Sequence, residues 1–518
     1  MLQLELSTTL LLFFLPFFFL FSIKSFFTFA TKSNKSSSSP VTKLPRSYPL
    51  IGSTLTISAN RERFNQWITE LIQNTTPTHH GTVILDRSLG RRHLITTNPA
   101  NVQHILKTQF YLYPKGNFSH DCLFSFLGSG IFNTDGENWK FQRQISSHAF
   151  NTKSLKKFVE TVVEAELSDR LLPLFSTSTT QKSVLDLQDI LQRFAFDNIC
   201  KIAFGFDPGY LSPSFPQPET EFAVAFEEAT QLSSKRFGSI FRGLWKVKRA
   251  FDIGSEKKLR IAVSKVRDYA TSIVREKKKE LEEKSSIETE DLLSRILNSG
   301  HVDETFVTDM VISFILAGRD TTSAALTWFF WLISRNPHTE KEILKEIGKE
   351  KPEGFNHYDE AKDMVYTHAA LCESMRLYPP VPSDGKEAAR DDVLPDGNIV
   401  KKGMQVTYHP YAMGRMESLW GKDWAEFRPE RWLEKEEITG KWKFVGKDLY
   451  TYTVFQAGPR ICLGKDMAFL QMKGVVAGVM RQFRVVPVDT GFEPVFVSYL
   501  TAKMKGGFPV RIEERGGE

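Results

Sequence analysis

The stretch of residues 309–333 constrains the fold of this chain more than any other feature. It reads DMVISFILAGRDTTSAALTWFFWLI, and its apolar residues run nearly all round a helix instead of forming one stripe. A helix of this kind has to be buried on every side. The stretch therefore predicts a helix that runs through the centre of a large domain.

Most of the remaining chain has helical periodicity, and a smaller part has the pattern of strands. Helical spacing of apolar residues marks residues 153–175, 257–284, 303–335 and 338–350. Alternating runs at 82–88 and 91–98, and short runs around the Asp-Gly and Lys-Gly turns of 393–408, predict strands. We expect a mainly α fold with a minor β part.

Composition excludes several classes of protein. The chain carries 67 basic and 61 acidic side chains, a net charge of +6 that is too balanced for a nucleic-acid binder. The 42 Phe residues favour an apolar pocket or a membrane contact. Four scattered cysteines fit neither a disulfide framework nor a Cys-x-x-Cys zinc site, and they indicate a reducing compartment.

The N-terminus predicts a membrane anchor. Residues 10–23 read LLLFFLPFFFLFSI, with a kink expected at Pro16, and basic residues without acidic ones follow. The positive-inside rule then places the rest of the chain in the cytosol. We expect an anchor over 1–23, a basic, Pro-containing linker over 24–49 and a folded body over 50–518. A cleaved secretory signal is the alternative, but Lys24 interrupts the apolar run and no Ala-x-Ala site follows.

One cysteine near the C-terminus lies in the setting of a metal ligand. The loop reads Phe455-Gln-Ala-Gly458-Pro-Arg460-Ile-Cys462-Leu-Gly464 and precedes a helical pattern. A lone cysteine there is by itself a small buried hydrophobe. Here the two glycines let the backbone approach closely, Arg460 supplies a fixed cation for a cofactor carboxylate, and Phe455 can keep water from the sulfur. The loop therefore predicts a thiolate metal ligand.

The central helix carries a polar pair in an apolar setting. Asp320 and Thr321 follow the small pair Ala317-Gly318. One interpretation is that Thr321 bonds back to a carbonyl of its own helix. The other is a local opening of the helix over a ligand, with a proton relay built into it.

These two motifs, Phe-x-x-Gly-x-Arg-x-Cys-x-Gly and Ala-Gly-x-Asp-Thr, resemble those of the cytochrome P-450 superfamily at every fixed position. The resemblance implies the cytochrome P-450 fold and a haem b cofactor, with Cys462 as the axial thiolate of its iron. It also implies that Thr321 hydrogen-bonds dioxygen and that Asp320 supplies protons.

Further motifs extend the resemblance over the whole body. Trp139 and Arg143 resemble the superfamily's pair that binds a haem propionate. Glu373, Arg376 and Arg431 resemble its buried cluster behind the cysteine loop, to which we assign folding and haem retention.

The substrate class is also suggested by resemblance. Residues 127–155 and 377–397 are similar to plant fatty-acid ω-hydroxylases of the legume type. This implies insertion of one oxygen atom of O2 into the terminal methyl of medium- or long-chain fatty acids. Neighbouring branches that hydroxylate jasmonoyl-isoleucine or sterol side chains share the motifs and stay open. Enzymes that rearrange fatty-acid hydroperoxides lack the distal Asp-Thr pair, so Asp320 and Thr321 argue against that class.

We expect an apolar tunnel that steers the chain end-on. By resemblance its walls come from residues 118–126, Phe314, Ala317, Pro382, Ser383 and Phe496. Lys386 or Arg390 could hold a carboxylate at its mouth, and the alternative is that both are ordinary surface charges.

Electrons have to come from a partner, because the sequence has no flavin or NAD motif. The resemblance implies a reductase that uses NADPH, at the endoplasmic reticulum membrane. Lysines expected near the cysteine side could attract an acidic flavoprotein; they are Lys140, Lys153, Lys156, Lys157, Lys465 and Lys473.

Overall fold

The structure, a computed structural model, describes residues 44–516 with short gaps. The gaps are residues 80, 148–149, 151–155, 213–219, 240, 284–290, 301–302, 349–356 and 492. The predicted anchor, 1–23, and most of the predicted linker lie outside the described residues. Within the described ranges, no helix combines the length and the apolar character that a membrane span needs. From Pro45 onward the described chain forms one compact unit.

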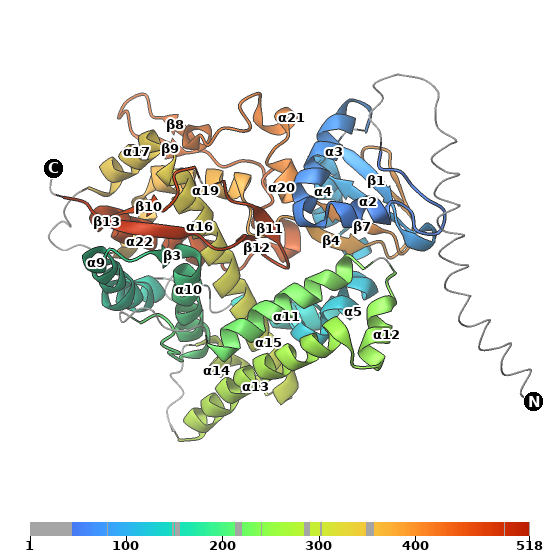
Figure 1. The fold of residues 1–518 in the computed structure, drawn as a ribbon, viewed down its shortest axis with the longest axis horizontal. Coiled ribbons are helices and arrows are strands. Elements are labelled where there is room, and N and C mark those ends of the chain that lie inside the picture. Colours follow the sequence, from blue (N-terminus) through green and yellow to red (C-terminus); the bar gives the residue numbers. More distant parts are fainter. Residues whose placement is uncertain are drawn as a thin grey trace, which may run out of the picture. The chain divides into compact units, whose positions relative to one another are not determined.

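The predicted central helix is present and consists of three consecutive pieces (Figure 1). They are α15 (Glu304–Ile315), the π-helical turn η8 (Leu316–Asp320) and α16 (Thr321–Ser334). Between Val307 and Ile333 every residue is buried except Ala317, Gly318 and Thr321. The helix is therefore covered on all sides except at one short window. Its main neighbours are α10 (Leu187–Phe204), α13 (Gly254–Glu283) and α19 (Val365–Leu377).

The other predicted helices are confirmed where the structure describes them. Residues 158–181 are continuously helical and end in α9 (Leu172–Gln181), residues 257–283 lie in α13 (Gly254–Glu283), and residues 338–347 lie in α17 (Pro337–Ile347). The remaining larger helices are α3 (Phe64–His79), α5 (Gly116–Leu127), α6 (Gly136–Ser147), α11 (Glu221–Phe237) and α22 (Lys465–Gln482). Shorter ones are α2 (Thr54–Ala59), α4 (Pro99–Gln103), α12 (Leu244–Ala250), α14 (Leu292–Leu297), α18 (His357–Asp363), α20 (Pro410–Met413) and α21 (Glu417–Trp420).

The largest described sheet has four strands in the order β1-β2-β7-β4. β1 (Thr82–Asp86) and β2 (Arg92–Thr96) pair antiparallel, as the alternating runs predict. β2 pairs in parallel with β7 (Gln405–Tyr408), which pairs antiparallel with β4 (Asp384–Glu387). The sheet thus joins the start of the body to a segment more than 300 residues later.

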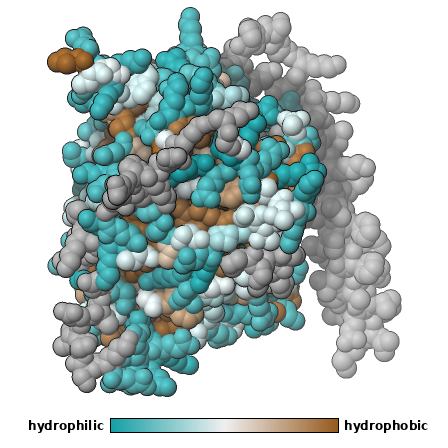
Figure 2. Space-filling view, turned by 90° about the vertical axis from the view of Figure 1, so that its left-hand side faces the viewer, coloured by the Kyte–Doolittle hydropathy of each residue, from teal (hydrophilic) through white to brown (hydrophobic). Residues whose placement is uncertain are grey.

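Smaller β elements complete the fold. The Asp-Gly turn at Asp396-Gly397 connects β5 (Asp392–Val393) to β6 (Ile399–Val400), as predicted. The others are β8 (Leu433–Lys435) with β9 (Trp442–Phe444), β11 (Phe496–Ser498) with β12 (Ala502–Met504), and β3 (Leu185–Asp186) with β13 (Pro509–Glu514) and β10 (Phe483–Pro487). The mainly α fold with a minor β part is confirmed. The face in Figure 2 is mostly hydrophilic, with apolar residues visible between hydrophilic ones.

Candidate active site

A cavity of about 940 Å³ lies between the central helix and the loop that carries Cys462. Its inner lining includes Ala317, Thr321 and Cys462. Its outer lining includes exposed residues such as Ser58 and Gly238, so one continuous space joins the surface to the cysteine. Two of the motifs found in the sequence therefore border the same cavity.

The cysteine loop is held by its own backbone and by close packing. The Cys462 amide donates to the Phe455 carbonyl at 2.9 Å. Gly458 has a φ of +66°, and a Cβ there would lie 2.1 Å from the Leu106 carbonyl oxygen, so only glycine fits. A Cβ at Gly464 would meet the Phe150 ring at 3.6 Å, an ordinary contact, so the packing of the described residues does not by itself require glycine there. The close approach expected at Gly458 is thus a contact with the backbone of Leu106, in an earlier segment of the same chain.

The Cys462 side chain has exposed area that faces the cavity. Burial raises the pKa of its thiol, whereas the Gly464 amide and the Arg143 guanidinium favour the thiolate. Phe455 and Gly464 line the same cavity, and the Phe455 ring packs on Phe469.

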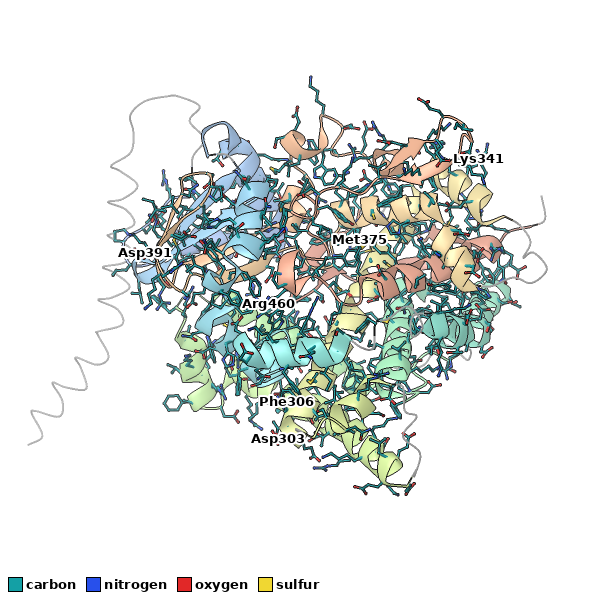
Figure 3. The ribbon with its side chains drawn as sticks, turned by 180° about the vertical axis from the view of Figure 1, so that it is seen from behind. Asp303, Phe306, Lys341, Met375, Asp391 and Arg460 are labelled. Atoms are coloured by element: carbon teal, nitrogen blue, oxygen red, sulfur yellow. The ribbon has the colours of Figure 1, made fainter. Side chains whose placement is uncertain are left out.

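Two arginines and a tryptophan border this end of the cavity. Arg460, labelled in Figure 3, donates to the Thr134 carbonyl at 2.8 Å and to Asp135 at 2.6 Å. Its guanidinium lies over the Trp139 ring, 4.5 Å from the centroid. Arg143 is half-buried, and burial lowers its pKa. It makes no ion pair with any residue that the structure describes, so a cation here faces the cavity without a counter-charge.

A buried ion cluster beside Arg460 was not predicted. Asp384 pairs with Lys115 at 2.8 Å and with Lys386 at 3.2 Å, and it accepts hydrogen bonds from Tyr408 and Gln456. Burial alone would raise the pKa of Asp384, but the two ammonium groups hold it well below its usual range. Burial lowers the pKa of Lys386 to about 7.

This cluster corrects the prediction for Lys386, whereas Arg390 agrees with the alternative that it is an ordinary surface charge. Lys386 is 3% exposed within β4, so it is neither a mouth residue nor a surface charge. Arg390 is exposed, and it does not line the cavity. The alternation of a short strand turns Lys386 inward, which the sequence alone does not reveal.

Both interpretations of the central helix hold in part. The Thr321 hydroxyl lines the cavity and donates to the Ala317 carbonyl at 2.6 Å, which is the expected bond back to its own helix. The five residues directly before Thr321 form the π-helical turn η8, so the helix also opens locally. A Cβ at Gly318 would lie 2.5 Å from the Ile199 side chain, which explains the glycine by its contact with α10.

Asp320 does not line the cavity. Its buried carboxylate pairs with Arg319 at 2.6 Å and accepts a hydrogen bond from Thr501 at 3.1 Å. Thr501, at the turn between β11 and β12, does line the cavity. Thr501 therefore connects Asp320 with the cavity, and no local pattern in the sequence identifies it.

The Glu-Arg-Arg cluster forms as predicted. Glu373 accepts two hydrogen bonds from Arg376, both at 2.8 Å, and one from Arg431 at 3.1 Å. Trp432 also donates to it, at 2.9 Å. None of these contacts reaches the cavity, in agreement with a role in folding.

The predicted walls are correct only in part. Phe118, Ser119, Leu123, Phe314, Ala317 and Ser383 line the cavity. Pro382 and Phe496 do not. Phe496 is 2% exposed and packs on Trp328 and Tyr411, while the next residue along β11, Val497, faces the cavity, because successive strand residues point to opposite sides.

One of the lysines proposed for a partner surface is buried. Lys473 is 6% exposed within α22, and burial lowers its pKa to about 8. Lys473 is therefore not part of a surface patch. Lys153 lies outside the described residues, and Lys140, Lys156, Lys157 and Lys465 are within them.

The residues of this end of the cavity fit a haem. Lys115 and Arg460 line this end of the cavity and pair with Asp384 and Asp135, so Arg143, together with Lys386 where it is protonated, leaves an excess of positive charge. Two propionates would neutralise this excess, with Cys462 as the thiolate ligand and Trp139 beside Arg460. When bound, a haem with a cysteine thiolate ligand activates O2 for insertion of one oxygen atom into a C–H bond.

Comparison with known proteins agrees with this geometry. The family model "Cytochrome P450" matches residues 43–503. Cytochrome P450 94A1 of Vicia sativa is 61% identical over 473 residues, which are 91% of each chain. Cytochrome P450 94A2 of the same plant is 61% identical over 484 residues, and cytochrome P450 94B1 of Arabidopsis thaliana is 47% identical over 492, each with at least 92% of both chains covered. The predicted resemblance to the superfamily, and to its legume members, is confirmed. The chain therefore belongs to the cytochrome P450 family of haem-thiolate monooxygenases.

Proposed function

We propose that this protein hydroxylates the terminal methyl of medium- or long-chain fatty acids. The observation that carries the proposal is the cavity, which has apolar walls from Phe118, Leu123, Phe314 and Val497 and leads from exposed residues to Cys462 and Thr321. Such walls bind an alkyl chain by excluding water from it. The resemblance of residues 127–155 and 377–397 to plant fatty-acid ω-hydroxylases supports this substrate class.

The chain's own residues have distinct tasks in this reaction. The apolar walls exclude water and orient the alkyl chain, and Cys462 holds the haem. Thr321 places its hydroxyl at the window of the central helix; the hydroxyl proton is donated to the Ala317 carbonyl, so the oxygen is the atom that accepts a hydrogen bond from the cavity side. Asp320 supplies protons toward the cavity through the hydroxyl of Thr501.

Electrons come from NADPH through a separate reductase. We propose that residues 1–23 anchor the protein in the endoplasmic reticulum membrane and that the catalytic body, 50–518, faces the cytosol. Lys465, at the start of α22 beside the cysteine loop, is the lysine we place at the reductase surface.

The test is turnover in microsomes with a plant reductase and NADPH. Fatty acids of several lengths are offered beside jasmonoyl-isoleucine and a sterol, and products are identified by mass spectrometry. NADPH-dependent ω-hydroxy fatty acids are expected, with none from Cys462→Ala. Hydroxylated jasmonoyl-isoleucine or sterol alone would contradict the fatty-acid assignment. Conversion of fatty-acid hydroperoxides without NADPH would contradict the monooxygenase reaction.

A further inference from the structure

Three cations line the part of the cavity that reaches the surface. Arg61 lies in the short helix η1 (Arg61–Arg63), Arg87 follows β1, and Lys235 lies in the last turn of α11. All three line the cavity. We refer to Arg61, Arg87 and Lys235 as the cationic rim.

Arg87 is a half-buried guanidinium with little to compensate its charge. It donates to the Phe237 carbonyl, at the end of α11, at 3.3 Å. It forms no ion pair with any described residue, and burial alone lowers its pKa. A guanidinium has five N–H donors, so most of its hydrogen-bonding capacity is not used by this one contact.

Arg61 and Lys235 add charge of the same sign. Lys235 donates to the Gln231 side chain at 3.2 Å, and burial and the nearby Arg61 lower its pKa. Neither residue has an ion-pair partner within the described ranges. Side chains of equal charge that lie together without a counter-ion repel each other, so an anion that binds between them is favoured.

The carboxylates of the cavity wall are already engaged. Among the described lining residues they are Glu62 and Asp384. Glu62 pairs with Lys505 at 2.9 Å, and Asp384 pairs with Lys115 and Lys386. The rim therefore keeps an excess of positive charge that the protein itself does not neutralise.

We propose that the cationic rim binds the carboxylate of the substrate, so that its apolar chain lies along the cavity toward Cys462 and Thr321. The inference rests on the proposed function and deepens it, because it requires a substrate with a free carboxylate at one end. When the substrate carboxylate is bound at the rim, the opposite end of its alkyl chain points to the end of the cavity that Cys462 and Thr321 line. A neutral sterol has no group for this site.

The experiment compares a free acid with its neutral ester. The holoenzyme is titrated with dodecanoic acid and with methyl dodecanoate, and binding is followed by the change in haem absorbance. Wild type is compared with Arg87→Gln, with Arg61→Gln/Lys235→Gln, and with the triple variant. The triple variant is expected to raise the Kd of the acid about tenfold or more and to leave the Kd of the ester unchanged.

A matched variant controls for the loss of three charges. Lys441, Lys443 and Lys447 are exposed and do not line the cavity. The variant Lys441→Gln/Lys443→Gln/Lys447→Gln is expected to bind acid and ester as wild type does. An unchanged Kd for the acid in the rim variant would overturn the proposal, as would a parallel rise for acid and ester, because a general distortion of the cavity affects both ligands.

The outcome is separable from that of the turnover assay. If only jasmonoyl-isoleucine is hydroxylated but its binding weakens in the rim variant, the rim is confirmed and the fatty-acid assignment fails. If fatty acids are hydroxylated but their Kd is unchanged in the rim variant, the fatty-acid assignment is confirmed and the proposal for the rim fails.

Discussion

At the scale of single residues, Glu373 shows how a buried charge is made tolerable. Its carboxylate is fully buried and accepts hydrogen bonds from Arg376, Arg431 and Trp432. Both carboxylate oxygens of Glu373 accept hydrogen bonds, so the cost of removing the charge from water is offset. The hydrogen bonds from Arg431 and Trp432 hold Glu373, and with it α19, to the segment that precedes β8.

Removal of this charge is expected to be costly. Glu373→Gln leaves the buried Arg376 guanidinium without a counter-charge, while Arg431 keeps its ion pair with Asp423, and it should lower the free energy of unfolding by about 3–5 kcal/mol. Urea unfolding and the haem-to-protein ratio measure the effect. The exposed Glu434→Gln serves as the control and should change stability by less than about 0.5 kcal/mol. A Glu373→Gln protein as stable as wild type would refute the structural role.

Thr501 is expected to matter through Asp320. Thr501→Val removes the hydroxyl that connects the buried carboxylate to the cavity. We expect at least a tenfold lower kcat, with more NADPH consumed per product and more hydrogen peroxide released, because proton delivery by a positioned group contributes about 10²–10⁴ in rate. Thr501→Ser keeps the hydroxyl and should retain most of the activity. Equal losses in both variants would indicate a packing effect instead.

At the scale of elements, the π-helical turn η8 shapes the distal side of the cavity. Gly318 lets α10 come so close that a Cβ would lie 2.5 Å from Ile199. Gly318→Ala is expected to destabilise the protein by about 1–3 kcal/mol and to weaken substrate binding, because α10 and the turn have to separate. Ile199→Ala in the same chain removes part of the clash and should restore part of the loss, as a double-mutant cycle in thermal unfolding would show. Additive losses would contradict a direct contact.

Sequence patterns predict the central helix but not the geometry of its turn. Residues 309–333 are apolar all round, so burial and helicity follow directly from composition. The π-helical turn changes the rotation of the helix, and with it the direction of Asp320, which points to Arg319 and Thr501 instead of the cavity. The periodicity of the helix carries no information on the contact between Asp320 and Thr501, which are 181 positions apart.

The sequence predicts the cysteine loop of the site but not the ion cluster beside it. A motif of adjacent residues marks Cys462 and Arg460 because one loop holds them. Lys115 directly precedes α5 and Asp384 and Lys386 lie in β4, so their cluster depends on the tertiary fold. Strand alternation also decides which of Phe496 and Val497 faces the cavity. A strand of three residues is too short for its register to be predicted from the sequence.

At the scale of the whole molecule, buried lysines make stability depend on pH. Burial lowers the pKa of Lys473 to about 8, against about 10.4 in an unfolded chain. Between these values the unfolded chain binds more protons, so the contribution of Lys473 to stability rises with pH. Lys473→Met should abolish a gain of about 2 kcal/mol between pH 7 and pH 9.5 in urea unfolding. The exposed Lys443→Met should leave the pH dependence of wild type unchanged, and an unchanged slope in Lys473→Met would contradict this assignment.

The parallel pairing of β2 with β7 has a consequence for synthesis of the chain. Residues 93–96 pair with residues 405–408. A nascent chain that has not yet reached Tyr408 holds the β1–β2 hairpin with one long edge unpaired, and unpaired edges are templates for association with other strands. Residues 97–408, about 60% of the 518-residue chain, are translated before this edge finds its partner, so conditions that slow elongation within that interval are expected to promote aggregation on the ribosome.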